Sequence, residues 1–155
     1  MAGVDLVALA DGIAARAHQG QVDKAGAPYI EHPRRVTRRL LELWPHAPAE
    51  AQAAALLHDV VEDTPVTIAQ LRSAGFPDAV LTAVDAVTKR AGESTEEYFA
   101  RIRSDALAPW VKAADLADNT DPVRLGRLPE ETRARLEAKY AKARRLLENL
   151  VPGDR

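Results

Sequence analysis

Apolar residues recur every three or four positions along most of the chain, in segments separated by proline and glycine. This spacing places them on one face of an α-helix, whereas a half-buried β-strand needs alternation at every second residue. In the segment Val4–His18, for example, Leu6 and Ile13 lie on the same stripe. No segment shows sustained two-residue alternation. We therefore predict an all-α fold.

Prolines, glycines and capping residues mark the ends of the expected helices. Thr67 and Ser94 each precede a glutamine or glutamate by three residues, which is the capping-box pattern of a helix N-terminus. Pro65 steers the residue before it out of the helical region and closes the preceding helix. The predicted helices are Val4–His18, Pro33–Leu43, Ala49–Glu62, Thr67–Gly75, Pro77–Thr88, Ser94–Ser104, Ala106–Asp118 and Pro129–Leu150.

The composition is that of a globular protein built on small and aliphatic residues. The chain has 155 residues, of which 46% are hydrophobic and only 5% aromatic, so the core must consist mostly of Ala, Leu and Val. This length corresponds to one domain, which we expect to cover residues 1–155. The absence of cysteine excludes disulfides, thiolate zinc sites and cysteine nucleophiles.

The charges argue against several classes of partner. The chain has 21 basic and 23 acidic residues, and therefore lacks the concentrated positive field that nucleic acids and anionic membranes attract. We find no positively charged leader and no apolar run of membrane-spanning length. We expect a cytoplasmic protein without nucleic-acid or membrane partners. The sequence leaves open whether the apolar face of the last helix closes the domain or meets a second subunit in an oligomer.

The densest group of chemically active side chains is the segment LHDVVEDT at residues 57–64. It follows an almost wholly apolar helical run, and burial of that run carries His58, Asp59, Glu62 and Asp63 towards the interior. Buried carboxylates are costly unless they are paired or bind a metal. The adjacent His58 and Asp59 offer a nitrogen and an oxygen to one divalent ion, with Glu62 and Asp63 a turn further on. The alternative is an ordinary solvated acidic cluster at the end of a helix.

Two other segments add the residue types that a metal site needs. His32 lies in PYIEHP at residues 28–33, just before a predicted helix. Asp115 and Asn119 share one face of a later helix, because they are four residues apart. With His58 and Asp59, these segments complete a set of two histidines and two aspartates. Mixed nitrogen and oxygen ligands of this kind suit Mn²⁺, Fe²⁺ or a similar ion better than a closed structural zinc site.

The chain resembles the HD-domain hydrolases of guanosine tetraphosphate and pentaphosphate, the hydrolase domain of the RelA/SpoT family and the small alarmone hydrolases. The similar motifs follow the order that they have in that family, and they cover about residues 4 to 125. They are AHQGQ at 17–21, PYIEHP at 28–33, ALLHDVVEDT at 55–64, VTK at 87–89 and VKAAD at 111–115.

This resemblance implies an all-α HD fold and metal-dependent hydrolysis of the 3′-diphosphate of the nucleotide, which leaves as pyrophosphate. It implies one Mn²⁺, or another divalent ion, held by His32, His58, Asp59 and Asp115. It implies that Glu62 and Asp63 activate or position the attacking water, without deciding which of them is the base. It implies that Lys24 and Asn119 contact the nucleotide.

Two departures from the family pattern concern substrate recognition. Asp23 stands where the family usually has an arginine, which removes an anion contact and adds repulsion towards a polyphosphate. Asp118 stands where the family has a histidine, so we expect one polar partner fewer near the site. Two alternatives therefore remain: a phosphohydrolase of another nucleotide or of a phosphorylated dinucleotide cofactor, and a non-catalytic nucleotide-binding HD module.

Overall fold

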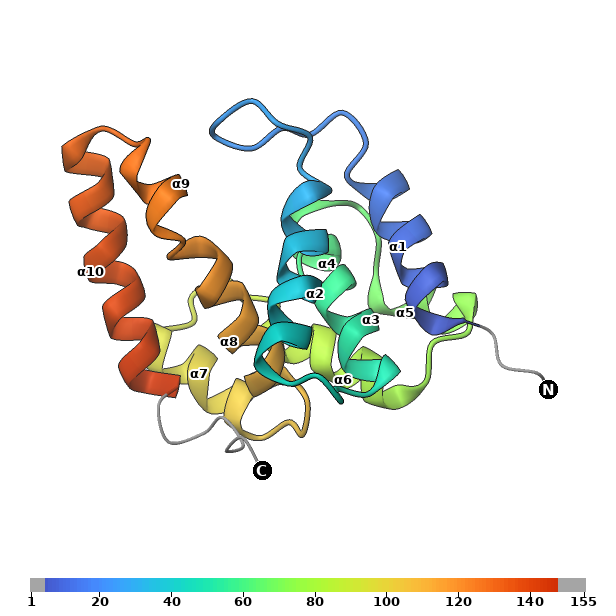
Figure 1. Ribbon diagram of the computed structural model, residues 1–155. Helices are drawn as coiled ribbons and strands as arrows, with labels where there is room; N and C mark the ends of the chain where they lie inside the picture. The colour runs from blue at the N-terminus through green and yellow to red at the C-terminus, as the bar shows by residue number, and fades with distance from the viewer. Residues whose placement is uncertain (1–4, 148–155) are drawn as a thin grey trace.

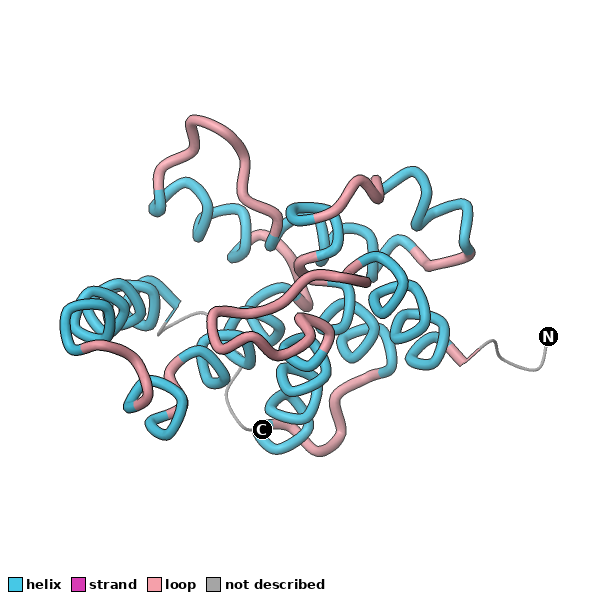
Figure 2. The backbone as a smooth tube through the Cα atoms, turned by 90° about the horizontal axis from the view of Figure 1, so that it is seen from above, coloured by secondary structure: helices cyan, strands magenta, loops and turns pink. Residues whose placement is uncertain are grey.

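The computed structural model describes residues 5–147, and within this range it contains helices, turns and a single isolated β-bridge but no strand (Figure 2). The prediction of an all-α fold is confirmed. The helices are α1 (Leu6–Ala17), α2 (Glu31–Leu43), α3 (Ala49–Leu57), α4 (Val60–Asp63), α5 (Ile68–Ala74), α6 (Asp78–Val87), α7 (Thr95–Arg103), α8 (Ala108–Asn119), α9 (Pro122–Gly126) and α10 (Glu130–Leu147).

The short helix α3 lies at the centre of the packing. It contacts α1, α2, α6 and α8 (Figure 1). Its residues Ala53, Ala54 and Ala55 are fully buried, and such small side chains let neighbouring helices approach closely. Helix α8 packs against α2 on one side and α10 on the other. The interior therefore consists mainly of Ala, Leu and Val, as the composition predicts.

Both predicted capping boxes are present in the structure. The Thr67 side chain accepts a hydrogen bond from the Gln70 amide, and the Gln70 side chain accepts one from the Thr67 amide. Ser94 and Glu97 make the same reciprocal pair at the start of α7. These local hydrogen bonds satisfy amides that the first helical turn leaves without partners.

The predicted continuous helix Ala49–Glu62 is wrong, because α3 ends at Leu57 and α4 begins at Val60. His58 Nδ1 lies 2.7 Å from the carbonyl oxygen of Ala55. In a continuous α-helix that oxygen would accept from the amide of Asp59. The histidine side chain thus competes for a helical acceptor at the break. His58 and Asp59 lie between the two helices, and this directs both side chains towards α2 and α8.

Smaller differences concern other helix ends. Helix α2 begins at Glu31, so His32 lies inside the helix rather than before it. Helix α9 was not predicted, since its five residues are too few to show a period. The ends that we expected at Val4 and Leu150 lie outside the described residues. Among the described helices, none is both long enough and apolar enough to cross a membrane.

Candidate metal centre and nucleotide pocket

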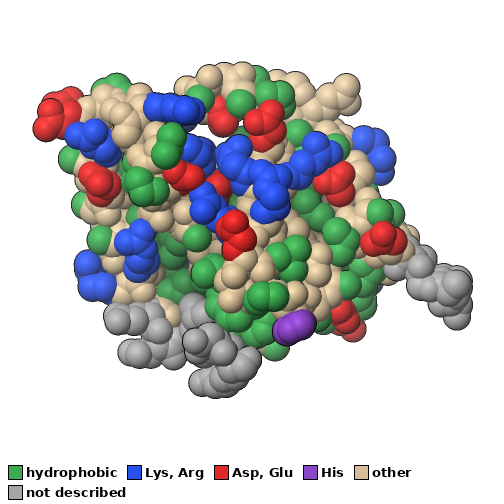
Figure 3. All heavy atoms as spheres, viewed as in Figure 1, with side chains coloured by type: hydrophobic (Ala, Val, Ile, Leu, Met, Phe, Trp, Pro, Cys, Tyr) green, Lys and Arg blue, Asp and Glu red, His purple; other side chains and the backbone are tan. Residues whose placement is uncertain are grey.

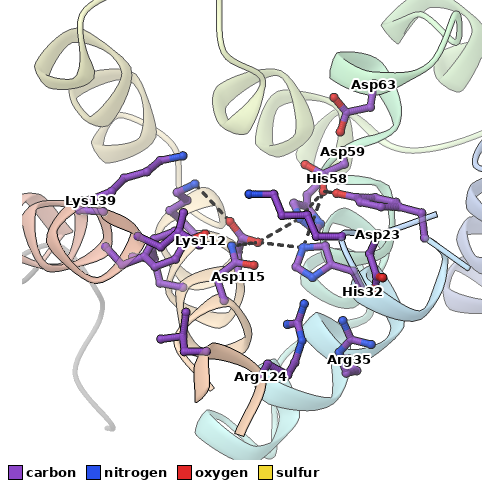
Figure 4. A pocket seen from close by; sticks show the side chains of 18 of the residues that line it. Asp23, His32, Arg35, His58, Asp59, Asp63, Lys112, Asp115, Arg124 and Lys139 are labelled. Atoms are coloured by element: carbon purple, nitrogen blue, oxygen red, sulfur yellow. Dashed lines mark hydrogen bonds and ion pairs between the residues drawn. The ribbon is translucent and has the colours of Figure 1, made fainter. Parts of the chain in front are cut away.

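A cavity of about 900 Å³ opens between the loop after α1 and the helices α2, α8 and α10. Its wall includes every candidate site residue predicted from the sequence. These are Lys24, His32, His58, Asp59, Glu62, Asp63, Asp115 and Asn119. Helices far apart in the sequence therefore bring the predicted residues together in one place, as Figure 4 shows for several of them.

Two histidines and two aspartates converge on one point of this wall (Figure 4). His32 Nε2 lies 3.1 Å from Asp115 Oδ1 and 3.7 Å from Asp59 Oδ2. His58 Nε2 lies 3.3 Å from Asp115 Oδ1 and 3.1 Å from Asp59 Oδ2. His32, His58 and Asp115 are buried and offer ligand atoms that all lie within 4.8 Å of one another. Asp59 lies at the more open side of the cluster.

The hydrogen bonds of the two histidines indicate that a cation fits this cluster. His58 Nδ1 donates to the carbonyl oxygen of Ala55, so in the neutral ring Nε2 carries the lone pair. That Nε2 atom is buried and has no hydrogen-bond partner in the structure. It faces carboxylate oxygens, which are themselves acceptors. A divalent cation between nitrogen and oxygen ligands would satisfy all of these atoms at once.

The ionisation of the cluster follows from its burial and its charges. Burial alone would lower the pKa of His58, but the carboxylates of Asp59 and Asp115 raise it well above its ordinary value. Burial would likewise raise the pKa of Asp115, but Lys112 and both histidines hold it well below its usual range. Asp115 is therefore an anion that is available as a metal ligand.

Asp115 is oriented by two neighbours on its own helix. Lys112 Nζ lies 3.2 Å from Asp115 Oδ2, and Asn119 Nδ2 donates to Asp115 Oδ1 over 3.2 Å. The ammonium group of Lys112 therefore neutralises part of the negative charge of the cluster. Asn119 lies on the pocket wall, but its amide already contacts a candidate metal ligand.

Tyr29 has a role at this cluster that the sequence did not indicate. Its hydroxyl donates a short hydrogen bond to Asp59 Oδ2, and its ring packs against that of His18 at a centroid distance of 4.8 Å. Burial and the charge of Asp59 raise the pKa of the tyrosine. The motif PYIEHP places Tyr29 three residues before His32, and this spacing is the sequence signal for a position near the cluster.

The loop after α1 carries Asp23 and Lys24 at the edge of the cavity. Asp23 Oδ1 accepts hydrogen bonds from the amides of Ala25 and Ala27 at 2.8 and 2.9 Å. The intervening Gly26 has a φ of 86°, a left-handed conformation that favours glycine in this turn. The carboxylate of Asp23 is thus engaged by its own loop, while the Lys24 side chain is exposed.

The expectation that Asp118 costs the site a polar partner is wrong. Its carboxylate is fully buried, and Asp118 Oδ2 lies 2.8 Å from His32 Nδ1. Arg35 and Arg124 also donate to it. Figure 3 shows basic side chains gathered over α2 and towards α9 on this face of the molecule. Asp118 supplies a negative charge beneath them.

Several lysines line the opposite side of the cavity. Lys112 and Lys139 extend from α8 and α10 towards its interior (Figure 4). Burial and then the charges of Lys89, Lys112 and Lys24 lower the pKa of Lys139. Mutual repulsion of this kind favours an anionic ligand that would lie among the ammonium groups.

A family model described as an HD domain matches residues 10–149. The chain belongs to the HD domain family. It is 38% identical over 133 residues to the guanosine-3′,5′-bis(diphosphate) 3′-pyrophosphohydrolase of Haemophilus influenzae, covering 80% of this chain and 19% of that protein. It is 39% identical over 146 residues to the GTP pyrophosphokinase of Streptomyces coelicolor, covering 90% of this chain and 16% of that protein. It thus spans less than a quarter of these curated relatives.

A similar solved structure is that of a metazoan orthologue of SpoT described as hydrolysing ppGpp. It superimposes with a TM-score of 0.79 and covers 97% of this chain and 89% of its own, at 24% identity. This likeness confirms the HD fold. The relatives bear out the resemblance that the sequence motifs carry.

Proposed function

We propose that residues 1–155 form a single metal-dependent phosphohydrolase domain that hydrolyses guanosine tetraphosphate or pentaphosphate at the 3′-diphosphate and releases pyrophosphate. The observation that carries this proposal is the convergence of His32 Nε2, His58 Nε2, Asp59 and Asp115 on the wall of a cavity lined by lysines. Relatives whose names state this reaction match most of the chain. We propose Mn²⁺ as the resident ion, because the ligands mix nitrogen and oxygen.

A divalent ion held by these four residues would lower the pKa of a coordinated water and polarise a phosphate oxygen. In the hydrolysis, the water oxygen bonds to the phosphorus attached to the 3′-oxygen, and the bond between that phosphorus and the 3′-oxygen breaks. The water proton passes to a carboxylate, for which Glu62 and Asp63 are the candidates. The 3′-oxygen takes up a proton and remains on the nucleoside.

The remaining residues bind and orient the nucleotide. Lys24 at the rim and Lys139 on α10 attract the phosphate charge. Asn119 holds Asp115 in place and lines the same wall. In this arrangement the metal cluster binds one end of the nucleotide while the lysines neutralise its other phosphates.

The direct test is turnover of guanosine tetraphosphate by the purified protein with Mn²⁺, with pyrophosphate followed by ³¹P NMR. We expect turnover in the unaltered chain and in His46→Ala, because His46 is an exposed histidine. We expect none in His58→Ala, which removes a buried ligand atom. Turnover that persists in His58→Ala would disprove this site.

A second candidate substrate class is another phosphorylated nucleotide, such as a phosphorylated dinucleotide cofactor. Asp23 favours it, because a carboxylate lines the pocket where the family usually has an arginine. The substitution Asp23→Arg distinguishes the two substrate classes. Asp23→Ala is the matched control, because both substitutions remove the hydrogen bonds that this carboxylate accepts from the amides of Ala25 and Ala27. Relative to Asp23→Ala, the arginine should change turnover little if guanosine tetraphosphate is the substrate, and should increase its hydrolysis if it is not.

A further inference from the structure

The side of the His32 ring that faces away from the metal cluster contacts a buried carboxylate. His32 Nδ1 lies 2.8 Å from Asp118 Oδ2, while Nε2 of the same ring lies 3.1 Å from Asp115 Oδ1. The two aspartates are three residues apart on α8. One helix thus contacts both nitrogens of a histidine that belongs to α2.

The carboxylate of Asp118 is also held by arginines from α2 and α9. Arg35 Nε on α2 lies 3.1 Å from Asp118 Oδ1 and 3.2 Å from Oδ2. Arg124 Nη1 on α9 lies 2.9 Å from Asp118 Oδ2. Figure 4 shows both arginines directed towards the His32 ring. Because these donors fix the carboxylate as an acceptor, the hydrogen bond from His32 must be donated by Nδ1.

We propose that Asp118 is a positioning residue, which fixes the ring orientation and the tautomer of His32 so that Nε2 presents its lone pair to a divalent cation. This inference rests on the proposed function only in requiring that the cluster binds a metal. Carboxylates that accept from the second nitrogen of a metal-binding histidine orient the ring and increase its basicity. Arg35 and Arg124 in turn orient the carboxylate.

Asp121 provides a matched control for the charge of Asp118. Asp121 Oδ2 lies 2.6 Å from Arg39 Nη2, and Arg39 Nε also lies 3.8 Å from Asp118 Oδ1. Replacing either aspartate removes one carboxylate from the same group of arginines, but only Asp118 touches His32. The variant Asp121→Asn still caps α9, because asparagine is as good an N-cap as aspartate.

The test is calorimetric titration of the metal-free full chain with MnCl₂ at one pH, for the wild type, Asp118→Ala, Asp118→Asn and Asp121→Asn. Circular dichroism identifies the variants that fold. We expect Asp118→Ala to weaken Mn²⁺ binding by about 10- to 100-fold. Asp118→Asn keeps an acceptor for the Nδ1 proton but loses the charge, so its affinity should be intermediate. Asp121→Asn should bind Mn²⁺ as the wild type does.

The comparison of Asp118→Asn with Asp121→Asn tests the positioning role even if Asp118→Ala does not fold. Equal Mn²⁺ affinity in Asp118→Asn and the wild type would overturn the positioning role, and so would an equal loss in Asp121→Asn. Because affinity is measured without substrate, this result is independent of turnover. A protein that binds Mn²⁺ in the expected order but leaves guanosine tetraphosphate intact would refute the proposed reaction and support the role of Asp118.

Discussion

Glu62 and Asp63 are adjacent in the sequence, but the fold gives their carboxylates different surroundings. Glu62 Oε1 accepts a hydrogen bond of 2.8 Å from the amide of Lys89. Asp63 has a raised pKa, because of its partial burial and then the charges of Asp59 and Glu62. A carboxylate with a raised pKa accepts a proton more readily at neutral pH. Asp63 is therefore the stronger candidate for the base.

We predict that Asp63→Asn lowers the turnover rate at saturating Mn²⁺ by about 100-fold or more, since general bases contribute effects of this size. Glu62→Gln should lower it less, because its glutamine oxygen can still accept from the Lys89 amide. Initial rates of pyrophosphate release measure both effects. A metal titration of each variant checks that the cluster is intact. A larger loss in Glu62→Gln would reverse the assignment.

The candidate metal ligands could be predicted at this scale, but their supporting partners could not. His58 and Asp59 were recognisable from their types and their adjacency. The partner of His32 Nδ1 is Asp118, which is 86 residues away in the sequence. Only the packing of α2 against α8 brings them together. From the sequence alone, we interpreted this aspartate as the loss of the histidine that the family has at this position.

At the scale of elements, an ion pair joins the loop before α7 to the last turn of that helix. Arg101 donates to both carboxylate oxygens of Glu93, with Nη2 at 2.9 Å from Oε1. The hydrogen bond from Arg101 holds the pKa of Glu93 at about 2, below the ordinary value of 4.5. The pair thus joins the loop after α6 to α7.

We predict that Glu93→Gln lowers the free energy of unfolding at pH 7 by about 1 kcal/mol. Because the folded state lowers the pKa of Glu93, its contribution is fully present above about pH 4.5 and is lost as the pH falls towards about 2. Urea unfolding at several pH values should show the two proteins converging in this interval. Asp78→Asn serves as the control, because the Asp78 side chain is 88% exposed and its ion pair with Arg72 is long, at 3.8 Å. An equal loss in both variants would contradict the prediction.

Local signals predicted the elements well where they acted within a few residues. The capping boxes at Thr67 and Ser94 are such signals, and both were confirmed. The break between α3 and α4 carries no proline or glycine. It arises where the His58 side chain takes up a carbonyl oxygen of its own helix while reaching towards α2 and α8. Because this break is caused by tertiary contacts, no periodic pattern in the sequence indicates it.

For the molecule as a whole, the candidate metal cluster joins parts of the chain that otherwise contact one another through packing and a few buried polar contacts, such as that between His32 and Asp118. His32 comes from α2, His58 and Asp59 from the junction of α3 and α4, and Asp115 from α8. An ion bound to all of them would link these elements in the folded state alone. The unfolded chain does not hold the four ligands together, so ion binding adds to the stability of the fold.

We therefore predict that Mn²⁺ raises the melting temperature of the chelator-treated protein. At a free concentration 100 times the dissociation constant, the stabilisation is about 2.7 kcal/mol, which corresponds to about 5–10 °C for a chain of 155 residues. His46→Ala should show the full increase, because its side chain is exposed and is not part of the cluster. His58→Ala should show little or none at the same concentration. A scanning calorimeter measures all three proteins with and without the ion, and an equal increase in His58→Ala would mean that Mn²⁺ binds elsewhere.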